Sequence, residues 1–85
     1  MKEEEIGVVD NYFNKVGVAA IKITSGTLSI GDKIRFLGNT TDFEQTVESM
    51  QIEHQPVEKV SAGDMVGIKT TDRVRKLDKV LKISE

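Results

Sequence analysis

Apolar and polar residues alternate along several short stretches of the chain, and this period of two predicts β-strands. Between residues 16 and 24, for example, Ala19, Ile21 and Ile23 fall on one face, which we expect to point toward a core. Apolar residues at helical spacing do not persist beyond one or two turns anywhere in the sequence. The pattern therefore predicts an all-β protein.

Six stretches carry this alternation, and turn residues separate them about every ten positions. The predicted strands are 5–13, 16–24, 33–37, 43–53, 65–70 and 79–83, with an extended bridge at 27–30 and a single helical turn at 58–61. The longest stretch changes phase near Ser49, which predicts a bulge or a strong twist. Short strands with no covering helix favour a small barrel or sandwich, because closure removes exposed sheet edges.

One short motif occurs three times, each time where a turn should lead into a strand. It is a glycine or leucine followed by aspartate, any residue and an aliphatic residue. The copies are 31–34, 63–66 and 77–80. Glycine reaches positive φ without strain, and an aspartate side chain bonds nearby backbone. The motif predicts three corners of the same kind.

The chain has 85 residues and no cysteine, so we expect one domain spanning 1–85, with a core of about 6–83 and no disulfide or thiolate metal site. No apolar run approaches the roughly 20 residues that a membrane span needs. The first residues, Met1 to Glu5, are acidic, whereas a signal peptide would be basic and then apolar. We expect a cytoplasmic protein and, given Met1, a complete gene product and not an excised domain.

Charge is distributed unevenly along the chain. The net charge is −2, but residues 69–82 carry six basic against two acidic side chains. Such a segment can contact phosphate. It can equally be an edge strand that lysines protect from pairing with other chains, and the sequence leaves both interpretations open.

Candidate catalytic chemistry is sparse. His54 is the only histidine and stands at a strand end, where a solvated side chain is expected. No serine turn of the Gly-x-Ser-x-Gly type accompanies it. The segment 26–33 approaches a phosphate-binding loop but has Asp32 where the lysine belongs. We therefore expect no catalytic residue, no metal, no cofactor and no bound nucleotide.

Four motifs in register give the chain a family resemblance. They are Ile6–Val9, Gly26–Asp32 in the form Gly-x-Leu-x-x-Gly-Asp, Thr46–Gln51 and Ala62–Ile68. Together they resemble the second domain of translational GTPases such as elongation factor Tu and initiation factor two. Tyr12–Ala19 and Thr40–Phe43 are similar to small translation elongation factor-like proteins. The chain departs from the family at Leu77, where glycine is usual.

This resemblance implies a closed six- or seven-stranded β-barrel with Greek-key-like connections, without the GTPase domain. It also implies a non-catalytic translation module that contacts tRNA, ribosomal RNA or the ribosome. Basic side chains would contact phosphate, and an exposed aromatic ring would stack on a base. The candidate RNA contacts are Phe13, Lys69, Arg73, Arg75, Lys76 and Lys79.

The alternative hypothesis is a protein-interaction module that docks on a separate GTPase or enzyme chain. Its candidate contacts are Tyr12, Val18 and Met50, because these residues fall outside the main inward phase of their strands. A tight barrel in which both phases are buried would explain the same residues without a partner.

Overall fold

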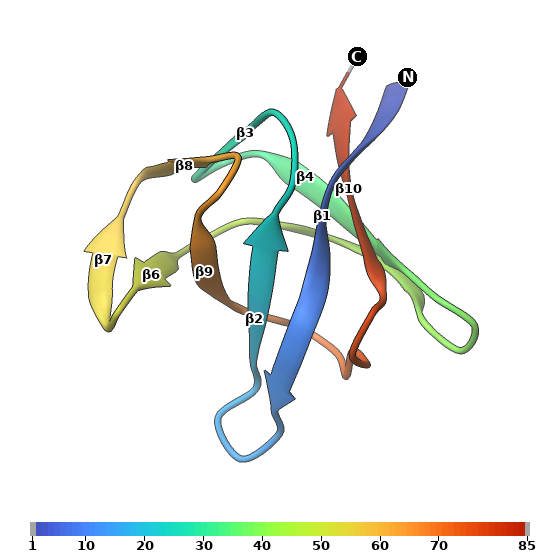
Figure 1. Ribbon diagram of the computed structural model, residues 1–85. Coiled ribbons are helices and arrows are strands. Elements are labelled where there is room, and N and C mark those ends of the chain that lie inside the picture. The colour runs from blue at the N-terminus through green and yellow to red at the C-terminus, as the bar shows by residue number, and fades with distance from the viewer. Residues whose placement is uncertain (1, 85) are drawn as a thin grey trace.

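The computed structural model describes residues 2–84, which contain ten strands and no helix (Figure 1). Met1, on which the expectation of a complete gene product rests, lies outside the described residues. The strands are β1 (Lys2–Phe13), β2 (Val18–Ile23), β3 (Thr27–Ser29), β4 (Lys33–Leu37), β5 (Asp42–Thr46), β6 (Met50–Ile52), β7 (Gln55–Val57), β8 (Lys59–Ser61), β9 (Met65–Lys69) and β10 (Lys79–Ser84). The predicted all-β class is confirmed.

Eight of these strands form one antiparallel sheet in the order β5-β4-β10-β1-β2-β9-β6-β7. The last strand, β10, therefore lies between β1 and β4. Lys2 pairs with Ser84, so the two ends of the described chain run together as a ribbon (Figure 1). The other two strands, β3 and β8, pair with each other. The helical turn predicted at 58–61 was wrong, because β8 extends to pair with β3.

The predicted closed six- or seven-stranded barrel is not formed, because neither sheet closes through backbone pairing among residues 2–84. The predicted strand 43–53 is divided into β5 and β6 by residues 47–49. Its two halves lie at different places, β5 at one edge and β6 beside β9. The Gln45 side chain spans the remaining gap: its Nε2 donates to the Lys69 carbonyl at 2.9 Å, and its Oε1 accepts from the Thr71 amide at 2.8 Å.

The three copies of the aspartate motif form three equivalent corners. In each, the aspartate amide donates to the carbonyl three residues earlier, and the aspartate Oδ2 accepts from the amide of that same residue, which is Ser29, Ser61 or Arg75. The residue before each aspartate has positive φ: 96° at Gly31, 99° at Gly63 and 76° at Leu77. These are type II turns closed a second time by the side chain.

Each corner also binds one buried residue of a neighbouring strand or connection. The amide of the corner residue with positive φ donates to the backbone carbonyl of the buried residue. The amide of the buried residue donates to the backbone carbonyl of the corner aspartate, and all of these bonds are 2.8–2.9 Å long. The buried partners are Val47, Ile23 and Val9, respectively. One motif therefore anchors the chain to the core at three places.

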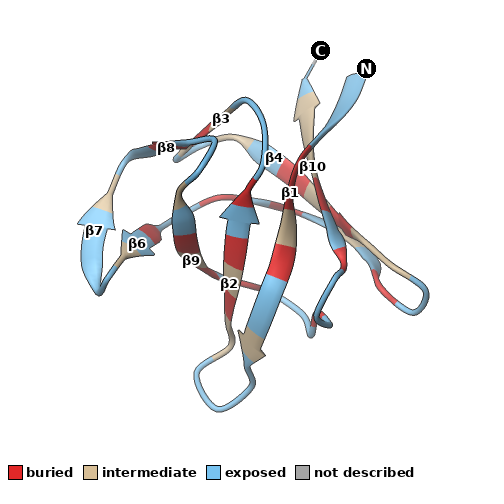
Figure 2. Cartoon of the chain, viewed as in Figure 1, coloured by how far each residue is buried: buried red, intermediate tan, exposed pale blue. Residues whose placement is uncertain are grey.

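The core is mainly aliphatic and takes residues from both ends of the chain. Phe36 is its largest member, and the Phe36 ring centroid lies 5.2 Å from that of Phe43. Ala19, Ile21 and Ile23 are fully buried, as the alternation predicted. Figure 2 shows buried bands on the strands and on several of the connections between them. Across residues 2–84, no helix is long and apolar enough to cross a membrane.

Candidate functional site

An apolar groove lies on the outer surface of the sheet, over β2, β9 and β6. Its lining residues are Phe13, Lys15, Val16, Val18 and Ala20 from β1, β2 and their turn, Met65, Val66 and Gly67 from β9, and Gln51, Glu53 and His54 from β6 and the turn after it. We call this surface the apolar groove.

Small residues form the floor of the apolar groove. Strand register places Gly67 between Ala20 and Gln51, and Gly67 faces outward because Val66 and Ile68 are buried. A Cβ atom at Gly67 would meet only Val18 Cγ1 at 3.4 Å and the Gln51 carbonyl at 3.7 Å. The space above Gly67 is therefore an unfilled side-chain position and not a place where two backbones crowd together.

Two turns form the walls of the groove. The β1–β2 turn contributes exposed apolar side chains, with Phe13 50% and Val16 60% exposed, and Met65 on β9 is 42% exposed. These are three of the five large hydrophobic side chains that are exposed in the described part of the chain. Singly exposed apolar residues are ordinary, but residues that converge on one hollow are typical of an interaction site.

The opposite wall is the two-residue turn between β6 and β7. Glu53 and His54 have φ of 50° and 66°, and Ile52 pairs with Gln55 across the turn. Two consecutive positive φ values define a type I′ hairpin, which normally takes Asn-Gly. Glutamate and histidine adopt this backbone at a cost of about 1 kcal/mol or more each, and both side chains line the groove.

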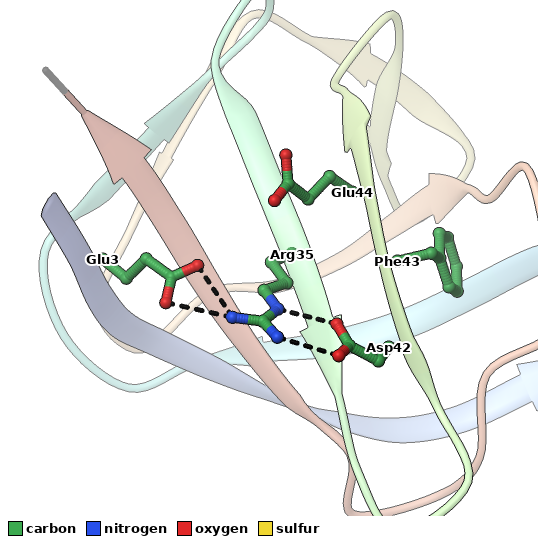
Figure 3. Close-up of a pocket in the computed structure, with 5 residues that line it drawn as sticks. All are labelled: Glu3, Arg35, Asp42, Phe43 and Glu44. Atoms are coloured by element: carbon green, nitrogen blue, oxygen red, sulfur yellow. Dashed lines mark hydrogen bonds and ion pairs between the residues drawn. The ribbon is translucent and has the colours of Figure 1, made fainter. Parts of the chain in front are cut away.

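A second, shallower hollow on the β4–β5 surface is occupied by charge pairs (Figure 3). Arg35 Nε and Nη2 donate to the two carboxylate oxygens of Asp42 at 2.7 and 2.8 Å, and Nη1 donates to Glu3 at 3.1 Å. The guanidinium is engaged on both sides by carboxylates of its own chain. This hollow therefore serves to attach the start of β1 to β4 and β5.

The charge pairs shift the pKa values of two of these groups. The hydrogen bonds from Arg35, and then its charge, hold the pKa of Asp42 below its ordinary value. Hydrogen bonds to Asp42 and Glu3 raise the pKa of Arg35. Within residues 2–84 no cluster of three or more histidine, aspartate or glutamate side chains is arranged to hold a metal ion.

The predicted RNA contacts line four hollows, two of which share Arg75. Arg75, Lys76 and Lys79 border one hollow, whereas Lys69 lies in another with Glu44 and Glu48. Arg75 also borders a third hollow together with Arg73 and Asp72, and Phe13 lines the apolar groove. Lys79 also forms an ion pair with Glu5 at 3.7 Å.

The three predicted protein contacts differ in their surroundings. Val18 lines the apolar groove, and Tyr12 packs, half-buried, against the core. Met50 is buried, so its proposed surface role was wrong. The reason is that residues 47–49 interrupt the strand. The alternation of inward and outward side chains starts again in β6, where Met50 faces the core and pairs with Ile68.

Sequence reasoning did not identify most residues of the groove, among them Ala20, Glu53, Met65 and Gly67. Small residues that face outward, Ala20 on β2 and Gly67 on β9, could have indicated a hollow. They lie side by side only because β2 and β9 are neighbours in the sheet. That adjacency is a long-range property of the sheet.

Comparison with known proteins identifies the family. The sequence profile of elongation factor Tu domain 2 matches residues 17–76. The chain belongs to the elongation factor Tu domain 2 family. The resemblance drawn from the four motifs is thus confirmed.

The relatives of this elongation factor Tu domain 2 homologue include proteins named as proteases. An uncharacterized protease of Methanocaldococcus jannaschii is 44% identical over 82 residues, which cover 95% of this chain and 20% of the relative. A collagenase of Porphyromonas gingivalis is 38% identical over 81 residues, covering 94% of this chain and 22% of the relative. The chain spans about a fifth of the length of these curated relatives.

The fold is shared with the C-terminal domain of a putative U32 peptidase of Geobacillus thermoleovorans. One crystal structure superposes with a TM-score of 0.88 at 20% identity and covers 95% of this chain and 93% of that chain. Its selenomethionine variant gives a TM-score of 0.85 at the same identity, covering 91% and 96%. At this identity, the likeness establishes the fold.

The predicted role in translation was wrong. The relatives of high identity are named as a protease and a collagenase, and the structural neighbours are peptidase domains. The motifs that suggested translation are turn and strand signals. They specify the fold, and one fold serves many functions.

Proposed function

We propose that residues 1–85 form one non-catalytic module that docks on a peptidase chain through the apolar groove. The observation that carries this proposal is the convergence of Phe13, Val16 and Met65 on a single hollow. This proposal follows the alternative hypothesis drawn from the sequence, in which the module docks on a separate GTPase or enzyme chain. The names of the relatives indicate which class of enzyme to consider.

The size of the chain relative to its relatives supports a module without its own catalytic centre. It corresponds to about a fifth of each protease relative, so most of each relative lies outside the matched segment. A small β-domain that leaves apolar side chains exposed is expected to cover them against a neighbour, because buried apolar area stabilises an interface. We place the module in the cytoplasm as part of this proposal.

The groove-filling variant Gly67→Leu tests the proposal. The Gly67 backbone does not have positive φ and its outward side is open, so we expect the variant to fold and its side chain to occupy the groove. Tagged wild-type chain, expressed in its source cells, should retain a peptidase chain identified by mass spectrometry. The variant should retain at least tenfold less.

A matched control separates the groove from general surface hydrophobicity. Leu77 is 73% exposed, the largest exposed fraction among the large apolar side chains of residues 2–84, and does not line the groove. Leu77→Asp should capture as much peptidase as the wild type. If no peptidase is retained, if Gly67→Leu retains as much as the wild type, or if RNase releases the bound chain, the proposal is wrong.

A further inference from the structure

The apolar groove has opposite charges on its two walls. Lys15 lies on the β1–β2 turn, and Glu53 on the β6–β7 turn, and both line the groove. The ion pairs among residues 2–84 involve neither of them. Each wall therefore presents one charge that can pair with an opposite charge on an occupant.

The floor of the groove bears on the shape of that occupant. The hollow is centred on one side-chain position, Gly67, between Ala20 of β2 and Gln51 of β6. An extended segment can place a single side chain in that position while its neighbouring residues stay at the rim.

A second copy of this chain is a poorer occupant. Two apolar grooves placed face to face bring two hollows together, so the space above Gly67 stays unfilled.

We propose that the apolar groove binds an extended segment in which an apolar residue has an acidic residue on one side and a basic residue on the other. The apolar side chain fills the hollow over Ala20 and Gly67. The acidic residue faces Lys15, and the basic residue faces Glu53. The inference rests on the proposed docking function and names the chemistry of the docked segment.

Strand geometry sets the spacing of these three residues. Side chains at i and i±2 of an extended chain project to the same side. The charged residues are therefore expected two positions before and two positions after the apolar residue, in either chain direction. Charges at the rim of an interface contribute more to selectivity than to affinity.

Selection from a library of random linear decapeptides displayed on phage tests this inference. The full 85-residue chain is the bait, and Gly67→Leu is used for counter-selection. We expect an enriched motif of acidic, any, apolar, any, basic, or its reverse. A synthetic peptide of that motif should bind the wild-type chain and lose at least tenfold affinity on Gly67→Leu, measured by fluorescence polarisation.

Single charge reversals provide the sharper readout. Lys15→Glu makes both walls acidic, so the selected motif should change to two basic flanking residues; Glu53→Lys should select two acidic ones. Each reversal should weaken the original peptide about fivefold. Lys59→Glu is the matched control, because Lys59 is exposed on β8 and outside the groove; it should leave the motif unchanged.

Three results would overturn the inference. One is a set of Gly67-dependent peptides with no preferred charges, which would leave the docking function intact. Another is self-association of the wild-type chain in sedimentation experiments that Gly67→Leu abolishes, which would make a second copy the occupant. The third is the absence of any Gly67-dependent peptide, even if the capture experiment retains a peptidase.

Discussion

Leu77 is the residue whose backbone conformation suits its side chain least. It occupies the position that glycine fills in the other two corners, with φ of 76°, and its side chain is 73% exposed. A non-glycine residue in this region costs about 1–2 kcal/mol. The third corner nevertheless has the same hydrogen bonds as the other two, so its aspartate, and not a glycine, maintains the geometry.

We predict that Leu77→Gly raises the free energy of unfolding by about 1 kcal/mol, since the strain at positive φ is removed. That gain corresponds to a rise in melting temperature of roughly 4–8 °C for a domain of this size. Thermal unfolding followed by circular dichroism measures it. Ile30→Gly is the control: Ile30 is also exposed in a corner, but without positive φ, so glycine there should not stabilise. An unchanged melting temperature for Leu77→Gly would show that the corner is not strained.

Asp42 gives the protein a specific sensitivity to acid. Its pKa in the folded chain lies below the ordinary value of 3.8 because Arg35 donates two hydrogen bonds to it. A group with a depressed folded pKa contributes stability that is present above the unfolded pKa and is lost as pH falls through the folded pKa. The contribution is therefore present at pH 7 and declines below about pH 4.

We predict that Asp42→Asn is less stable than the wild type at pH 7, and that the difference shrinks as the pH falls below about 4. Urea unfolding at a series of pH values from 7 to 2.5 measures both. Glu48→Asn is a suitable control, since Glu48 is exposed and belongs to none of the ion pairs of the described residues. A gap between Asp42→Asn and wild type that is constant with pH would mean that the Arg35 pair does not stabilise the fold.

Among the strands, β5 and β9 show how a side chain replaces backbone pairing. β5 is an edge of the large sheet, and Gln45 connects it to the end of β9 through the Lys69 carbonyl and the Thr71 amide. Gln45 is buried and both bonds are partly buried, so the Lys69 carbonyl and the Thr71 amide would each lose a protein partner if Gln45 were removed. Unpaired buried polar groups are costly.

We predict that Gln45→Leu lowers the free energy of unfolding by about 1–3 kcal/mol, because a similar-sized apolar side chain leaves both backbone partners unpaired. The same change should speed hydrogen exchange at the Thr71 amide. Thr46→Ala, the exposed neighbour on β5, should change either quantity little. Unaltered exchange at Thr71 would show that the Gln45 contact does not hold the edge.

The strands themselves were predicted with unequal success. The short stretches 65–70 and 79–83, which turn residues bound, correspond closely to β9 and β10. The stretch 43–53 was read as one strand, since its apolar residues tolerate either phase around Ser49. The break there depends on Val47 binding the first corner, a contact between distant segments.

Taken together, the strands form a sheet that depends on its last member. β10 pairs with both β1 and β4 and contributes the fully buried Val80. The chain cannot complete the sheet until its final residues have joined strands made much earlier. Such non-local pairing is typical of slow-folding β-proteins.

We predict that a chain ending at Asp78 does not fold cooperatively, because β1 and β4 both become unpaired edges and the core loses Val80. Its proton–nitrogen spectrum should lack the dispersion of a folded protein. Adding the peptide 79–85 in trans should restore that dispersion, whereas a scrambled peptide should not. A folded spectrum for the truncated chain would show that β10 is dispensable.

The assignment of function failed where the assignment of family succeeded. Glycine and aspartate at the corners are required by backbone geometry, whichever partner the domain meets. They therefore identify the elongation factor Tu domain 2 family and carry no information about translation. The groove on the outer surface, which Ala20, Gly67 and Met65 help to form, is encoded by no corner motif.

Local chemistry along the chain was sufficient for the all-β class, the three aspartate corners and the buried face of β2, because alternation and turn residues act over a few neighbours. Tertiary structure decided that the sheet stays open, that Met50 is buried and that a groove forms over Gly67. These features depend on which distant strands become neighbours. Strand adjacency is set by packing of the whole core, so short-range sequence patterns do not reveal it.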